Sequence, residues 1–366
     1  MKSLKSLLTV AVPCLFLFAM LFRPQAALEG AQSGLVLWAG SVLPAVYPFL
    51  VGASLFVAAG TPQKIGNILH IPGKALFRLG PAASGSMLLG WVCGAPGGPR
   101  AYREMYDRGE ISRGELCRLC SVANGASPLF LLGAVGVALL NSAALGALLL
   151  GVQTLSMLLN GLLWRPLGDG TIILRAKKAT SDATLFSHLP SAIRDSCLAM
   201  LAIGGAIALF STLASLISAY GVLATIENAL SALLPAPVVR AMLTGALELT
   251  MGCNEAARLI DMRLTAALCA GICSFGGLSV AIQSYLFIKD VMPLSVYLLQ
   301  RLSQGIIAFF LALVATRAFP ETLAQAFAPL TIATAAAASP VGPALLCLGA
   351  LLLVALGCAA WAQRTR

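Results

Sequence analysis

The run Cys93-Gly-Ala-Pro-Gly-Gly-Pro99 interrupts an apolar segment of this chain, and it decides the fold. Its prolines lack a backbone N–H, and its glycines lose much conformational freedom when ordered, so a helix cannot continue through it. Irregular backbone at membrane depth is tolerated only where it lines a cavity or is buried in protein. The sequence therefore predicts a re-entrant hairpin at residues 81–99, with its broken tip turned toward the protein interior.

A second copy of this pattern follows later in the chain. Two stretches share Met, Leu, Gly, Gly, Ala and Arg at the same spacing, Met87–Arg103 and Met242–Arg258. Beyond a connector of different length, Asn124–Ser127 falls opposite Ser274–Gly277. The chain is therefore expected to contain two equivalent units, each with a broken hairpin and a polar turn at the start of the next span.

The composition places both units in a membrane. The chain has 366 residues, of which 59% are hydrophobic and 10% charged, with a mean hydropathy of +0.90. Soluble domains carry about 25% charged residues. Apolar segments of the length needed to cross a bilayer, about 20 residues, recur throughout. Backbone groups in lipid must be satisfied within their own segment, so the expected fold is an all-α polytopic membrane protein.

The positive charges predict the topology. With a cytoplasmic N-terminus and hairpins that return to the side they came from, most Lys and Arg fall in cytoplasmic loops, as insertion requires. The other face keeps only Arg23, Arg240, Arg258, Arg263 and Arg317. This explains the net charge of +10 without nucleic acid, for which no basic stripe with aromatics is present. Residues 100–118, where basic and acidic side chains alternate, are expected to form a solvated surface helix.

The hairpins then enter from opposite sides, which makes an inverted repeat, the architecture of many secondary transporters. About eight spans are expected, at residues 7–22, 35–59, 121–140, 143–164, 197–219, 264–288, 294–316 and 341–362. The first could instead be a signal peptide, although its cleavage site is poor. The predicted domains are a peripheral helix (1–34), the first repeat (35–164), a basic cytoplasmic loop (165–193), the second repeat (194–316, hairpin 238–257), and a loop with a C-terminal helix (317–366).

The broken segments are the candidate substrate site. Free N–H groups and positive helix ends at a hairpin tip suit an anion such as a carboxylate. The candidate substrate-binding residues are Gly94, Gly97, Gly98, Asn124, Ser127, Thr250, Ser274, Gly276, Gly277, Ser279, Gln283 and Arg301. Each serine could instead bond back to its own helix, and Arg301 could balance Glu248 or snorkel to the interface.

An ionisable residue inside a spanning region is a functional candidate. Glu248 could bind a coupling proton or sodium ion, or pair with an arginine. No metal site or cofactor is expected, because the one CxxC, Cys117–Cys120, has no second pair. An enzyme is not expected either, since His70 and His188 lie in loops and no nucleophile–base pair is present.

Several of these motifs resemble the YlbJ (SpoVV) family of sporulation membrane proteins, built from nucleoside-recognition gate domains. The matching pieces are Gly90 with Cys93–Arg100, Gly109–Ser112, Asn124–Gly136, Glu248–Gly252 and Ser274–Leu278. Departures are Arg100, near which the family has a lysine, Gly125 and Ala126 in place of an asparagine-rich turn, and Ala281, near which the family is polar.

This resemblance implies a fold similar to concentrative nucleoside transporters and a role in endospore formation. It implies movement of dipicolinate from the mother cell across the outer forespore membrane. The leading expectation is thus a transporter of a small carboxylate in the lipid bilayer, coupled to H+ or Na+ or to neither. The alternative is a non-transporting scaffold or small-molecule sensor of the sporulation machinery. Gly- and Ala-rich helix faces would also permit a homo-oligomer.

Overall fold

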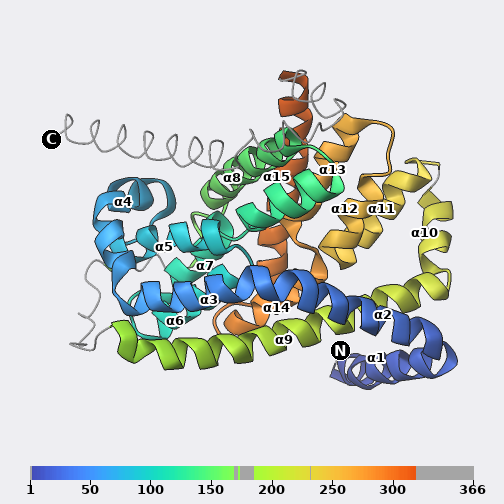
Figure 1. The fold of residues 1–366 in the computed structure, drawn as a ribbon, viewed down its shortest axis with the longest axis horizontal. Coiled ribbons are helices and arrows are strands. Elements are labelled where there is room, and N and C mark those ends of the chain that lie inside the picture. Colours follow the sequence, from blue (N-terminus) through green and yellow to red (C-terminus); the bar gives the residue numbers. More distant parts are fainter. Residues whose placement is uncertain (1, 169–171, 174–184, 231, 319–366) are drawn as a thin grey trace.

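The computed structural model describes residues 2–168, 172–173, 185–230 and 232–318. These residues form helices joined by short turns, which confirms the all-α polytopic fold (Figure 1). The first half contains α1 (Lys2–Phe22), α2 (Pro24–Leu37), the π-helical η1 (Trp38–Val42), α3 (Leu43–Ala58), α4 (Thr61–Phe77), α5 (Pro81–Cys93), α6 (Gly97–Asp107), α7 (Arg113–Val122), the π-helical η2 (Phe130–Leu139) and α8 (Ala143–Leu163). The second half contains α9 (Leu185–Ala219), α10 (Val222–Leu230), α11 (Ala236–Leu247), α12 (Leu249–Ala256), α13 (Met262–Phe275), α14 (Gly277–Ile288) and α15 (Leu294–Ala318).

Four stretches of the described residues are long and apolar enough to cross a bilayer: 143–163, 187–219, 262–288 and 294–318. A fifth is possible if α1 and α2, which meet at a bend of 104°, count as one span. The four stretches overlap four of the predicted spans, 143–164, 197–219, 264–288 and 294–316, and the bent pair overlaps the predicted spans 7–22 and 35–59. The total of eight stays a prediction, and the span expected at 341–362 lies outside the described residues.

The two predicted units contain the same order of elements. In the first, α4 is followed by the pair α5 and α6, then α7, a non-helical break, η2 and α8. In the second, α10 is followed by the pair α11 and α12, then α13, a break at Gly276, α14 and α15. The hairpin pairs break at 94–96 and at Glu248. The opposite orientation of the two units in a bilayer stays a prediction.

Two regions expected to be loop or surface contain packed helix. The loop before the first hairpin holds α4, which lies against α5 through Gly66 and Gly73. The helix α9 begins at Leu185, before the predicted end of the basic loop, and runs beneath α3 and α2 along the lower edge of Figure 1.

The expectation that residues 100–118 form one solvated helix is wrong. The segment turns after α6, and every residue of α7 from Gly114 to Val122 is buried. Glu115 makes this burial possible, because its carboxylate accepts from the backbone N–H of Ser112 at 2.8 Å and of Gly80 at 2.6 Å. Arg118 donates to the carbonyl of Leu167 at 2.8 Å. Charged side chains are tolerated here because they satisfy backbone groups.

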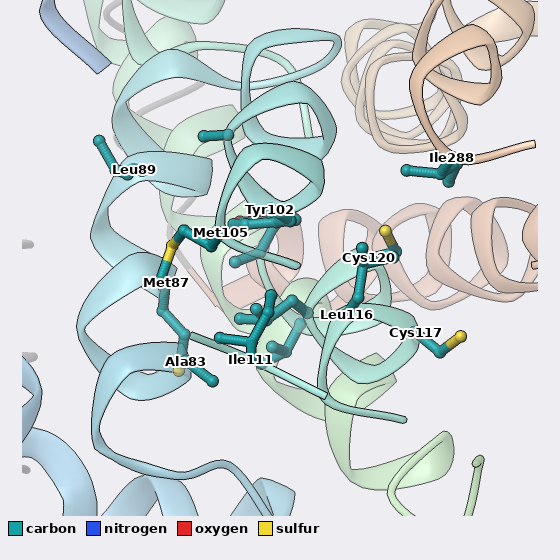
Figure 2. Packing of buried hydrophobic residues seen from close by; sticks show 14 of the residues in the cluster. Ala83, Met87, Leu89, Tyr102, Met105, Ile111, Leu116, Cys117, Cys120 and Ile288 are labelled. Carbon is teal, nitrogen blue, oxygen red and sulfur yellow. Dashed lines mark hydrogen bonds between the residues drawn. The ribbon is translucent and has the colours of Figure 1, made fainter. Parts of the chain in front are cut away.

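The largest apolar cluster joins α5, α6 and α7 to α14 and α15. Figure 2 shows Met87, Tyr102, Met105 and Leu116 converging between these helices. The Tyr102 hydroxyl also donates to the carbonyl of Ala123 at 2.6 Å, just beyond α7. This contact ties the hairpin to the first break, so the core positions the segment that lines the site described below.

Close glycine contacts hold each hairpin together. A Cβ atom on Gly252 would lie 2.1 Å from the Cα atom of Gly245, and one on Gly98 would lie 3.1 Å from that of Gly90. Gly90, Gly245 and Gly252 are repeat-matched glycines of the sequence, and Gly98 directly follows the matched Gly97. Their role is to let the two helices of each hairpin approach at backbone distance.

Replacing Gly252 with alanine should force α11 and α12 apart and destabilise the protein. Overpacking of this kind costs about 1–3 kcal/mol, and we expect the midpoint of thermal unfolding in detergent to fall by roughly 5 °C. The matched control is Gly151→Ala, because a Cβ atom there meets nothing within 4 Å. Equal midpoints for the two variants would contradict the packing role.

Candidate substrate site

A cavity of about 100 Å³ lies where the broken segments of both units meet. Its wall takes Cys93 and Pro96 from the first hairpin, and Gly125 from the first break. Seven of the residues singled out in the sequence also line it: Ser127, Glu248, Thr250, Gly276, Ser279, Gln283 and Arg301. This central cavity therefore gathers residues that lie up to 264 positions apart in the chain, from Leu37 to Arg301.

The other candidate residues do not line the cavity. Gly94, with φ +64°, packs on the first break, since a Cβ atom there would be 2.6 Å from the Ser127 nitrogen. Gly277 packs on the second hairpin in the same way, 3.0 Å from the Gly245 carbonyl oxygen. Each unit thus uses a glycine to hold its break against its hairpin. The remaining four, Gly97, Gly98, Asn124 and Ser274, do not line the cavity, although the carbonyls of Asn124 and Ser274 accept hydrogen bonds from Arg301, which does.

Arg301 joins the two breaks. Its guanidinium donates to the carbonyl of Asn124, two residues beyond α7, and to the carbonyls of Ser274 and Phe275, the last two residues of α13. Its Nη1 also donates to Gln304 Oε1 at 2.8 Å. Helix C-termini carry partial negative charge, so one cation stabilises two helix ends, one from each unit.

The Arg301 residue is 2% exposed, so its side chain does not reach the membrane interface, as the snorkelling alternative requires. Among the described residues, no ion pair joins it to a carboxylate, Glu248 included. The alternative in which Arg301 balances Glu248 is therefore not what the structure shows. Carbonyl dipoles alone compensate a buried positive charge on the cavity wall.

Glu248 forms the break of the second hairpin. Its backbone is extended, with φ −142° and ψ 125°, and its carboxylate accepts from the Met251 N–H at 2.7 Å, so it caps α12. The residue is 6% exposed. It faces the central cavity and also a larger cavity beside it.

The serines are held locally. Ser127 Oγ accepts from the N–H of Phe130, the first residue of η2, at 3.3 Å, while Gln283 donates to Ser279 Oγ at 3.0 Å. Hydroxyl donors on the wall remain able to rotate toward a ligand. Among the described residues, no cluster of His, Cys, Asp or Glu could hold a metal ion.

A polar network that the sequence reading missed supports the first break. Gln153 of α8 donates to the Ala126 carbonyl at 2.7 Å and accepts from its N–H at 3.0 Å. Asn124 Nδ2 donates to the Tyr297 hydroxyl at 2.9 Å, and Asn160 Nδ2 to the Ser121 carbonyl at 3.0 Å. The signal was present, because Gln153 and Asn160 lie seven residues apart on one face of an apolar helix, where polar side chains join helices.

Two larger cavities lie beyond the central one. The acidic vestibule, about 820 Å³, is lined by Glu29, Glu227, Glu248 and Glu255, with Arg240 as its one cation among the described residues. Arg240 is paired with Glu227 at 2.7 Å. The arginine vestibule, about 450 Å³, is lined by three arginines and three carboxylates: Arg100, Arg103, Arg108, Glu104, Asp107 and Asp195. In the predicted topology the arginine vestibule faces the cytoplasm.

Comparison with known proteins identifies the relatives of this chain. The sporulation integral membrane protein YlbJ of Bacillus subtilis (strain 168) is 27% identical over 336 residues, which cover 84% of this chain and 82% of YlbJ. The resemblance to the YlbJ family is confirmed. No protein-family model matches the chain. A solved structure of a variant of CNTnw, a concentrative nucleoside transporter, in the intermediate 1 state is 14% identical, with a TM-score of 0.40 over 83% of this chain and 89% of that chain.

Replacing Arg301 with lysine should loosen both breaks, even without substrate. An ammonium is a point charge and cannot span acceptors from two helix ends as the guanidinium does. We expect the thermal unfolding midpoint in detergent to fall by roughly 5 °C or more, since hydrogen bonds to charged groups contribute about 1.5–3 kcal/mol. Arg317→Lys, on an exposed position of the same helix, is the control. An unchanged midpoint for Arg301→Lys would show that the breaks do not depend on it.

Proposed function

We propose that this chain is a membrane transporter that moves a small carboxylate by alternating access during sporulation. Dipicolinate, a small planar dianion, is the proposed substrate, and the outer forespore membrane the proposed location. The observation that carries the proposal is the central cavity, which is built from the breaks of both units around a buried cation. A scaffold would gain nothing from interrupted helices at this place.

The chemistry of the cavity favours an anion. The helices η2, α12 and α14 each begin beside residues that line it, so their positive ends lie close to the cavity. Arg301 adds a full positive charge without a carboxylate partner among the described residues. A carboxylate entering the cavity would supply the missing negative charge.

Three cavities in a row supply a route. Along α9, Asp195 lines the arginine vestibule, Ile207 the central cavity and Ser211 the acidic vestibule. The segment from α2 to α3 passes the cavities in the opposite sequence direction. Leu37 lines the acidic vestibule and the central cavity, and Ser54, further along the chain, lines the arginine vestibule. At 1.5 Å per residue, Asp195 and Ser211 are about 24 Å apart, a large part of the bilayer core of about 30 Å.

The route is closed at one end. An apolar cluster of buried side chains, which we call the gate, stands between the arginine vestibule and the central cavity: Leu50, Ala199, Met200, Ile203 and Ile207. The central cavity and the acidic vestibule instead share Leu37, Glu248 and Thr250. This difference between the two ends is what a transporter in one of its two access states requires.

The central cavity must widen to hold a substrate. Ligand pockets enclose about 300–1,000 Å³, whereas this cavity has about 100 Å³. In the proposed cycle, substrate binding separates the helices around the cavity. Glu248, which faces both the cavity and the acidic vestibule, is the proposed site for a coupling proton or sodium ion.

The test is flux of labelled dipicolinate into proteoliposomes, with Glu248→Gln beside the native protein. We expect saturable flux for the native chain and a loss of at least tenfold in the variant. Removing the carboxylate removes the coupling group and replaces the α12 cap with an uncharged one. Glu255→Gln, in the same helix and vestibule, is the control and should keep most of the flux.

Full flux in both variants would keep the transporter and limit Glu248 to a structural role. Native protein that is folded and binds dipicolinate but shows no flux would contradict transport and favour the sensor or scaffold. Native protein that neither binds nor moves dipicolinate would contradict the substrate.

A further inference from the structure

One arginine in the arginine vestibule differs from its neighbours. Arg103 is paired with Asp107 at 2.8 Å, and Arg108 is paired with Glu104. Arg100 has no ion pair within 4.0 Å among the described residues, and its side chain donates only to the neutral hydroxyl of Ser196, at 3.1 Å. The Arg100 guanidinium is therefore the cation of this cavity that remains available to an incoming anion.

The carboxylates near Arg100 are committed elsewhere. Glu104 accepts from Ser54 Oγ at 3.3 Å and pairs with Arg108, and Asp195 pairs with Arg194 at 3.2 Å. Burial raises the pKa of the Glu104 carboxyl, although Arg108 and Arg100 oppose this. A carboxylate ligand would thus meet a guanidinium whose negative neighbours already have partners.

Arg100 also lies at the entrance to the gate. Pro96 lines the central cavity, and Arg100, four residues later in the chain, lines the vestibule. Its partner Ser196 is in α9, one helical turn before the gate residue Met200. An anion held by Arg100 would therefore stand directly outside the apolar gate.

We propose that Arg100 is the residue that recruits the carboxylate substrate in the arginine vestibule, before the gate opens. This inference rests on the proposed function and adds to it a second binding site, separate from the central cavity. The carboxylate would take the place of the Ser196 hydroxyl and accept two parallel hydrogen bonds from the guanidinium, the geometry that distinguishes arginine from lysine. Half-burial of Arg100 strengthens this contact, because less water screens it.

The test compares Arg100→Gln, Arg100→Lys and Arg103→Gln in proteoliposomes with labelled dipicolinate. Arg100→Gln should raise KM about tenfold or more while the maximal rate changes little, because recruitment precedes the opening of the gate. Arg100→Lys keeps the charge without the planar fork and should raise KM several-fold. Arg103→Gln is the control, because Arg103 lines the same cavity but is already paired with Asp107. The KM of this variant should stay within twofold of the native value.

A native KM in Arg100→Gln, or an equal rise in Arg103→Gln, would overturn the inference and leave the proposed function intact. If Arg100→Gln does not fold, an unchanged KM in folded Arg100→Lys overturns it. If the native protein shows no flux, the proposed function fails. Equilibrium binding of dipicolinate in detergent then decides whether Arg100 recruits the anion. Tenfold weaker binding by Arg100→Gln supports the recruiting role, whereas equal binding, or none by the native protein, overturns it.

Discussion

The structure depends on one buried cation that holds the ends of two interrupted helices. Arg301 donates to the carbonyl of Asn124, two residues beyond α7, and to the carbonyls of Ser274 and Phe275 at the end of α13, so three carbonyl groups at the two breaks have a partner. In lipid, unsatisfied backbone groups are too costly to leave exposed. The breaks can therefore persist only where such a donor reaches them. Gln153, which bonds both backbone groups of Ala126, has the same effect on the first break.

This arrangement separates the two kinds of helix end. The C-terminal ends of α7 and α13 are directed to Arg301, while η2, α12 and α14 begin beside the cavity. The cavity wall therefore combines N–H groups, hydroxyls and a cation, all of which favour an anion. Glu248 is the exception, and it lies where the central cavity meets the acidic vestibule. A group that could bind a cation, Glu248, and a wall that favours an anion therefore lie next to each other, as coupled transport would require.

The two vestibules differ in charge. Counted over the described residues, the acidic vestibule has four carboxylates and one arginine, whereas the arginine vestibule has three of each. A dianion leaving through the acidic vestibule would meet repulsion, which favours release over rebinding, while cations would collect there. At the other end, Arg100, which forms no ion pair within the described part of the chain, would place the proposed anion contact directly before the apolar gate. The charge distribution is therefore consistent with the proposed movement of an anion from the arginine vestibule toward the acidic vestibule.

The sequence by itself determined the membrane class, the broken segments and their repeat, because composition and Gly/Pro runs act locally on every segment. It also identified residues such as Glu248 and Arg301, since an ionisable side chain in an apolar segment is conspicuous. Only the tertiary structure decided which of these residues share a cavity and which support its wall. It also showed that α7 is core, because the partners of Glu115 and Arg118, Gly80 and Leu167, lie far along the chain. The charge pattern of a segment shows which charged side chains it contains. It does not show whether they are buried, because burial of a charged side chain depends on partners that only folding brings into contact.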